Sequence, residues 1–147
     1  MKKFKYRLAP LLKMREQEER NRQIDHAHAL GRVHEQEQVN AGIARQREET
    51  MQRHRRRLEG HLAPGQLLLY SRYHQKLKRD NLTGQEVLKA LRKEESRRRA
   101  RLLEAARERK KYEKLGERLA RRHAKDSEDA ERKETDEMAL STYRLKH

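Results

Sequence analysis

Gly60-His61-Leu62-Ala63-Pro64-Gly65 decides the fold, because it is the strongest helix breaker in the interior of the chain. Proline lacks the backbone N–H donor, and its ring clashes with the preceding helical turn. On either side lie roughly fifty and eighty residues rich in Glu, Arg, Lys, Gln, Leu and Ala. One break between two helix-prone tracts predicts an all-α fold, a long two-helix antiparallel coiled-coil hairpin.

Composition argues for this fold and against a globule. Of the 147 residues, 33 % are hydrophobic and 43 % are charged, with one Phe and no Trp. That is too little apolar surface to enclose a core, but enough for a narrow seam between two helices. The net charge of +15 also overlaps the disordered class, so part of the chain could become ordered only on a partner.

Several protein classes are excluded by what the sequence lacks. Without cysteine there is no disulfide framework, thiol nucleophile or Cys-ligated metal. The basic N-terminus has no signal-peptide apolar run, and the longest apolar run, Leu67 to Tyr70, is too short to cross a bilayer. We therefore expect a soluble, cytoplasmic protein.

We expect a single domain over residues 1–147, with a first helix at about 10–60, a tip at 61–66 and a second helix at about 67–144. Pro10 suits a first helical position, although a continuous helix from Lys3 with a kink is an alternative. Thr83-Gly84-Gln85-Glu86 fits a capping box, so a break between Asp80 and Gly84 is conceivable. A continuous second helix is favoured.

The seam is predicted from alternating three- and four-residue steps. In the first helix the apolar members of this line are separated by polar ones, so the seam should hold its register loosely. The apolar members are Leu12, Leu30, Val33, Ala44, Met51 and Leu58, and the polar ones are Glu16, Glu19, Gln23, His26, Glu37, Asn40, Arg47 and His54. The line in the second helix is more apolar: Leu67, Tyr70, Leu77, Leu88, Leu91, Leu102, Ala105, Tyr112, Leu119, Ala130 and Leu140.

The two arms have unequal lengths. If the break is the tip, position i faces roughly position 127 − i, and residues after about 125 have no partner on the first helix. We therefore expect an overhanging C-terminal helix. Its apolar side needs another protein to cover it, and comprises Ala130, Met138, Ala139, Leu140 and Tyr143.

No catalytic arrangement or phosphate-binding loop is present, and no cofactor is expected. The histidine cluster around His26, His28 and His34 does not have metal-ligand spacing, because side chains two residues apart on a helix diverge. A two-helix hairpin also cannot build a concave pocket. The sequence predicts neither a metal site nor an enzyme.

Basic residues are unevenly distributed. Residues 89–125 carry sixteen Lys/Arg against six Glu, whereas residues 126–147 carry four against seven acids. Arginine clusters at 53–57 and 97–101 are either solvated faces or contacts for phosphate or anionic lipid. A basic coiled-coil nucleic-acid-binding protein is thus the alternative function, but the chain lacks stacking platforms and DNA-reading motifs. Peripheral association with an anionic membrane through the same basic faces is a third possibility. No specific nucleic-acid partner is expected, and any membrane association should be peripheral and protein-mediated.

Three segments resemble one family. The run from Phe4 to Glu16, FKYRLAPLLKMRE, is similar to the F-x-Y-x-L-x-P-L-L-x-x-R-E opening of the bacterial flagellar export protein family FliJ. The run from Tyr70 to Leu77, YSRYHQKL, resembles that family's Y-x-x-[YF]-x-x-x-L stretch. Near the C-terminus, RKETDEMA at 132–139 is similar to its basic-then-DE-x-A ending.

The resemblance implies a stalk or coupling component of the flagellar type III export apparatus, similar to the central stalk of rotary ATPases. It implies three partners: the hexameric export ATPase, the cytoplasmic domain of the membrane export gate, and export chaperones. The expected location is peripheral to the cytoplasmic face of the inner membrane at the flagellar base. The virulence-secretion counterpart of the family is not separated from the flagellar one by these motifs.

The resemblance also implies two sets of site residues. ATPase-binding residues would be Phe4, Tyr6, Leu8, Leu11, Leu12, Lys133, Asp136, Glu137 and Met138, and export-gate-binding residues would be Ile43, Tyr70, Tyr73 and Leu77. Without the resemblance these would be ordinary seam residues or a solvated face. The family often has small or apolar residues one and two turns after Leu77, where this chain has Asp80 and Gly84.

Overall fold

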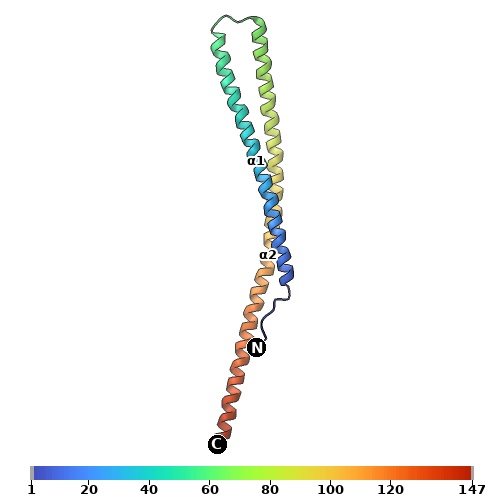
Figure 1. Ribbon diagram of the computed structural model, residues 1–147, viewed down its shortest axis with the longest axis vertical. Helices are drawn as coiled ribbons and strands as arrows, with labels where there is room; N and C mark the ends of the chain where they lie inside the picture. The colour runs from blue at the N-terminus through green and yellow to red at the C-terminus, as the bar shows by residue number, and fades with distance from the viewer. Residues whose placement is uncertain (1, 147) are drawn as a thin grey trace. The chain divides into compact units, whose positions relative to one another are not determined.

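The computed structural model describes residues 2–146, which form two helices and, within that range, no strand. Helix α1 spans Ala9–Leu58 and helix α2 spans Pro64–Lys146. Figure 1 shows the turn that joins them and reverses the chain. The predicted all-α antiparallel hairpin is confirmed.

The helix boundaries differ slightly from those predicted. Residues 2–6 have no regular secondary structure, so a helix from Lys3 is wrong. The turn covers residues 59–63 rather than 61–66, because Pro64 is the first residue of α2. A proline fits this position, since its fixed φ suits the helix and its missing N–H would have no helical acceptor. The Ala63 carbonyl accepts hydrogen bonds from the amides of Gln66 (3.0 Å) and Leu67 (3.4 Å). The second helix passes unbroken through 80–84 and ends two residues later than predicted.

The chain divides into two compact units. The hairpin unit is Arg22–Leu102, and the terminal unit combines the segment ending at Asn21 with the segment starting at Leu103.

The seam of the hairpin unit is thin and partly polar. Its buried residues are Ala29 and Leu77 among the apolar side chains, and Thr50 and Glu95 among the polar ones. The amide nitrogen of Asn40 donates to the Gly84 carbonyl at 3.1 Å. A Cβ at Gly84 would overlap the Asn40 side chain, so glycine permits this close approach. Interhelical hydrogen bonds therefore supplement a small apolar core.

The predicted seam of α1 is half right. Its members His26, Val33, Asn40, Arg47 and His54 are partly buried, as predicted. The remaining predicted positions are displaced by one residue. Leu30, Ala44, Met51 and Leu58 are exposed, and the residues that face α2 are instead Ala29, Ile43 and Thr50. In this rotation small side chains face α2, and Asn40 meets the bare backbone of Gly84. In α2 the predicted members from Tyr70 to Tyr112 are buried or partly buried, but Leu67, Leu119, Ala130 and Leu140 are exposed.

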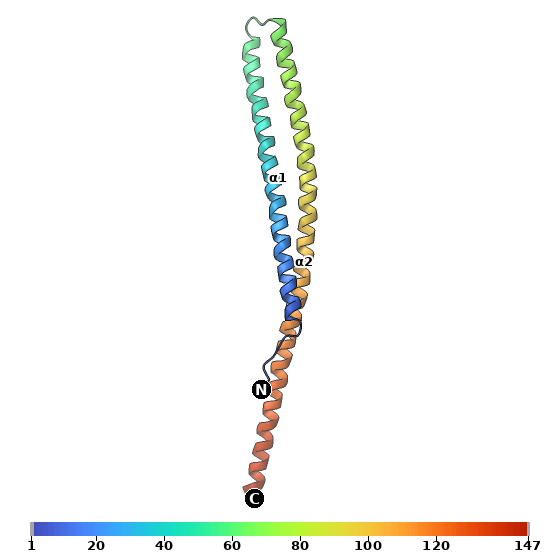
Figure 2. The ribbon, with the colours of Figure 1, turned by 45° about the vertical axis from the view of Figure 1, so that its right-hand side comes forward.

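In the terminal unit the N-terminal segment runs along α2 (Figure 2). The Tyr6 hydroxyl donates to the Tyr112 carbonyl at 2.7 Å. Its ring lies over Gly116, where an added Cβ would come within 3.1–3.3 Å of three ring carbons. Farther along, the rings of Phe4 and His123 are 5.5 Å apart. Tyr6 and Phe4 therefore attach the non-helical start of the chain to α2.

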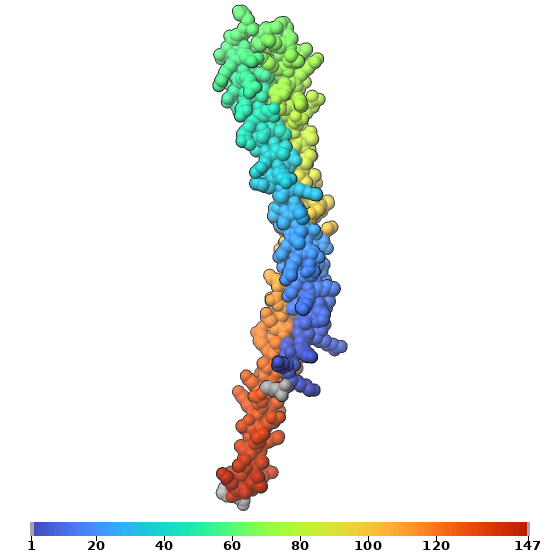
Figure 3. Space-filling view, viewed as in Figure 1, coloured from blue at the N-terminus to red at the C-terminus, as the bar shows by residue number. Residues whose placement is uncertain are grey.

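Beyond this contact no other part of the described chain covers α2. Every residue from 128 to 146 is exposed, and no other segment covers the red end of the helix on the face seen in Figure 3. The predicted overhanging C-terminal helix is confirmed. Neither helix of the described chain combines the length and the apolar character that a membrane span requires.

Candidate partner-binding surfaces

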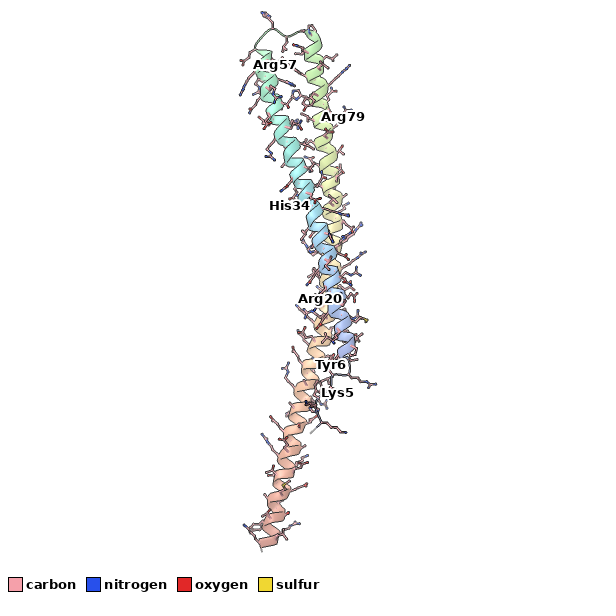
Figure 4. All side chains as sticks on the ribbon, viewed as in Figure 1. Lys5, Tyr6, Arg20, His34, Arg57 and Arg79 are labelled. Carbon is pink, nitrogen blue, oxygen red and sulfur yellow. The ribbon has the colours of Figure 1, made fainter. Side chains whose placement is uncertain are left out.

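The first half of the predicted ATPase-binding set lies where the N-terminal segment enters α1. Phe4 is 38 % exposed, and Leu8, Leu11 and Leu12 are half-buried. Figure 4 shows Tyr6 beside α2 and Lys5 next to it. These side chains thus help to attach the segment to α2 and also present apolar atoms to solvent.

The second half of that set lies further along α2, and all four residues are exposed. The N-terminal segment reaches only as far as a shallow groove formed by Lys2, Lys3, His123, Ala124, Ser127 and Glu128. Lys133 follows Glu128 by five residues, or roughly 7 Å of helix. Of the first half, Phe4 lies farthest along α2, beside His123, and ten residues, or roughly 15 Å of helix, separate His123 from Lys133. The structure therefore does not bring the two halves of the set together.

The end of α2 presents apolar side chains in several directions. Met138 (68 % exposed) and Leu145 (87 %) share one face, because seven residues make nearly two helical turns. Leu140, 60 % exposed, lies two residues from Met138 and therefore on nearly the opposite face. The segment 126–147 carries a net charge of −3 from seven acids and four Lys/Arg. We call residues 126–146 the acidic end.

At the other site, aromatic rings meet between the last turns of α1 and the first turns of α2. The His54 ring stacks on Tyr70 with 3.7 Å between centroids. Its Nδ1 lies 2.7 Å from Nε2 of His74. Arg57 donates to the Tyr70 hydroxyl at 3.1 Å. This cluster joins the two helices close to the turn, and Figure 4 labels Arg57 there.

Electrostatics at this cluster disfavour a further positive charge. The pKa of His54 is lowered from its ordinary value, first by burial and then by His74, Arg53 and Arg57. Because imidazoles 2.7 Å apart cannot both be protonated without repulsion, the contact requires at least one neutral ring.

The predicted gate-binding residues divide into two pairs. Tyr70 and Tyr73 are half-buried with edges in solvent, and Gln46 donates to the Tyr73 hydroxyl at 2.8 Å. Ile43 is half-buried in the seam, and Leu77 is only 3 % exposed. The tyrosines can therefore touch a partner, whereas Leu77 acts beneath them by holding the helices together.

Sequence reasoning missed the exposed leucines around the turn. The predicted seam includes Leu58 and Leu67, yet Leu58 is 53 % and Leu67 51 % exposed, and their neighbours Leu68 and Leu69 are 54 % and 62 % exposed. Three consecutive leucines cannot all face one seam, because successive residues are about 100° apart on a helix. That pattern was the available signal.

Midway along the hairpin unit a buried charge is well partnered. Glu95 lies 2.8 Å from His26 Nε2 and 2.5 Å from an Arg99 nitrogen. The pKa of Glu95 is lowered, chiefly by the His26 hydrogen bond and also by Arg99, against the opposing effect of burial. His26, one of the histidines considered for a metal site, thus contributes to helix pairing. Among residues 2–146 no three potential metal ligands converge.

Comparison with known proteins identifies the family. No curated protein and no solved structure matches the chain. The family model described as flagellar FliJ protein matches residues 4–147, which include the segments that pack at Phe4, Tyr6 and Tyr70. Proteins of this family are associated with flagellar export. The chain belongs to the FliJ family.

Proposed function

We propose that this protein is a coupling component of the flagellar export apparatus that binds the hexameric export ATPase through its acidic end and N-terminal segment. The observation that carries the proposal is the exposed helix at 128–146, in a chain matched by the FliJ family model to its last residue.

The distribution of apolar side chains supports a partner that surrounds the helix. Met138 and Leu145 lie on one face and Leu140 on the other, all more than half exposed. A helix that is apolar in several directions becomes stable when it is enclosed. A central opening in a ring of subunits would enclose it, whereas a flat surface would cover one face only.

The same proposal assigns the export gate to Tyr70 and Tyr73. Both hydroxyls are held, by Arg57 and Gln46 respectively, so the rings are fixed before a partner arrives. Preorganised aromatic side chains lose little entropy on binding and are frequent binding hot spots. We also propose that the protein assists export chaperones and is located at the flagellar base. Only its membership of the family supports these two points.

The ATPase assignment is tested with Met138→Glu/Leu140→Glu in the full chain. Binding to the purified export ATPase, measured by sedimentation, should weaken at least tenfold, because two charges would enter the enclosing surface. Leu103→Glu is the control, since Leu103 is likewise more than half exposed, at 53 %, but lies outside the acidic end. Equal binding by the double variant and wild type would refute the assignment.

The gate assignment is tested separately with Tyr73→Ala, measuring binding to the cytoplasmic domain of the gate. We expect a several-fold loss with unchanged ATPase binding. A loss of both would indicate a folding defect, which circular dichroism would detect as lower helicity.

A further inference from the structure

The end of the hairpin unit combines exposed leucines with a surplus of positive charge. The leucines are Leu58 at the end of α1, Leu62 in the turn, and Leu67, Leu68 and Leu69 in the first turns of α2. We call them the leucine cap. Four are more than half exposed, and Leu62 is partly exposed.

Cationic side chains follow the leucine cap on both helices. On α1 they are Arg53, Arg55, Arg56 and Arg57, and on α2 they are Arg72, Lys76, Lys78 and Arg79. Residues 51–79 contain eight Lys/Arg and one Glu, a net charge of +7. Arg72 lies three residues beyond Leu69, or about 5 Å along the helix. The order from the turn inward is therefore apolar first and basic second on both helices.

We propose that this end of the hairpin inserts the leucine cap into the surface of an anionic lipid bilayer. The leucines enter the boundary between headgroups and acyl chains, and the arginines and lysines contact lipid phosphates. The depth order of the side chains matches the order of the two bilayer layers. This contact is direct. It adds insertion of the leucine cap to the electrostatic contact that the basic clusters alone would make, and it is separate from binding to the ATPase and the gate.

The arrangement favours lipid over nucleic acid or a protein groove. A nucleic acid would use the cations but offer nothing to the aliphatic leucines, because single strands are bound by aromatic stacking. A protein groove would cover one face of α2, whereas Leu67, Leu68 and Leu69 spread over about 200° of its circumference. A fluid layer with negative phosphates meets both features.

Vesicle flotation at 150 mM salt tests the proposal with the full-length protein. Wild type should bind vesicles of phosphatidylcholine with 30 % phosphatidylglycerol at least tenfold more tightly than pure phosphatidylcholine. Leu67→Gln/Leu68→Gln/Leu69→Gln should lose at least tenfold on the anionic vesicles, and its helicity should stay unchanged because the replaced side chains are exposed. Arg55→Gln/Arg56→Gln should lose several-fold.

Two controls match these changes elsewhere in the chain. Leu103→Gln removes one equally exposed leucine, and Arg101→Gln/Arg107→Gln removes two exposed positive charges. Both should bind anionic vesicles like wild type. The proposal is overturned if the triple leucine variant binds as wild type does, or if the control arginine pair matters as much as Arg55 and Arg56. Binding of a 30-nucleotide single strand at the same salt, with vesicle binding absent, would also overturn it.

Insertion itself is measurable because the natural chain contains no Trp. Leu68→Trp introduces one probe, whose emission should shift to the blue on anionic vesicles and be quenched by brominated acyl chains. Leu103→Trp should show neither effect. If the emission of Leu68→Trp stays unquenched while the protein is bound, the binding is purely electrostatic adsorption, and the role of the leucine cap is refuted. Neither readout involves the ATPase or the gate, so the proposed function stands or falls separately.

Discussion

The acidic end and the leucine cap both expose large apolar side chains, but their surroundings carry opposite charge. Residues 126–147 have a net charge of −3, and residues 51–79 have +7. The acidic end would be repelled by an anionic bilayer, whereas the leucine cap would be attracted to it. In the proposed interactions, exposed apolar area would supply affinity in both places, while the surrounding charge would select the class of partner.

The largest expected effect comes from reversing the charge of the acidic end. Glu134→Lys/Asp136→Lys/Glu137→Lys changes its net charge from −3 to +3. If charge selects the partner, this variant should lose ATPase binding and gain vesicle binding through a second site, at least tenfold over wild type. Vesicle flotation with the triple leucine change in the same chain isolates the new site. An unchanged partner preference would show that shape, not charge, separates the two regions.

Substitution of a core leucine should lower the stability of the protein much more than substitution of a surface leucine. Leu77 is 3 % exposed, so Leu77→Ala should lower the free energy of unfolding by about 2–3 kcal/mol. Leu140 is 60 % exposed, so Leu140→Ala should lower the free energy of unfolding by less than about 0.5 kcal/mol. Urea unfolding followed by circular dichroism compares the two. Similar costs would mean that the acidic end is covered in solution.

The N-terminal segment depends on one hydrogen bond and one missing side chain. Tyr6→Phe removes the 2.7 Å bond to the Tyr112 carbonyl and should cost about 1 kcal/mol of local stability. Gly116→Val should release the segment more completely, since Tyr6 lies over the bare backbone there. Proteolysis after Lys5 or Arg7 reports the release. Equal cleavage of wild type and both variants would contradict the contact.

Acid should loosen the pairing near His54. The pKa of His54 is lowered in the folded chain from its ordinary value of 6.5. Below about pH 6.5 the unfolded chain therefore binds a proton more readily than the folded chain does, and the free energy of unfolding decreases as the pH is lowered. Glu95, whose pKa is lowered from 4.5, adds a second loss as pH falls below that value. Hydrogen exchange of amides 50–58, corrected for intrinsic rates, should accelerate between pH 7.5 and 5.5. His54→Gln should reduce this dependence.

The smallest effect is expected at the ion pair between Arg92 and Glu37. Their atoms are 3.1 Å apart, but the side chains are 61 % and 43 % exposed. Arg92→Gln should change the free energy of unfolding by less than about 0.5 kcal/mol. A clear shift in the urea midpoint of unfolding for this variant would show that the ion pair contributes more than expected.

Much of the fold could be predicted from the sequence, because Pro64 interrupts otherwise uniform helical tracts. The pairing rule places residue 73 opposite His54 and residue 87 opposite Asn40, and the observed contacts are His74 and Gly84. The exact seam of α1 could not be predicted, since Leu30 and Ala29 fit the same rhythm. The space at Gly84 on the partner helix accommodates Asn40 in the observed rotation, and the sequence of α1 alone does not reveal it.

The candidate sites were predicted less completely. The family resemblance indicated the site residues, but it could not distinguish half-buried Tyr70 from buried Leu77. Docking of Tyr6 on Gly116 joins residues 110 positions apart, and no local pattern encodes such a contact. Leu67 fits the rhythm of the seam, and only its 51 % exposure in the structure shows that it lies outside it.

The polar seam of α1 has a consequence during synthesis. At 5–20 residues per second, the 83 residues of α2 take roughly 4–17 seconds to emerge after α1. During that time α1 has no partner helix, and the side that it will later bury carries the small or medium apolar residues Ala29, Val33 and Ile43. The rest of that side is largely polar, with His26, Asn40, Arg47, Thr50 and His54. A nascent helix with so few apolar atoms on that side gives neighbouring chains little to aggregate with. The same polar seam that makes helix pairing modest in the mature protein thus lowers the tendency of nascent α1 to aggregate.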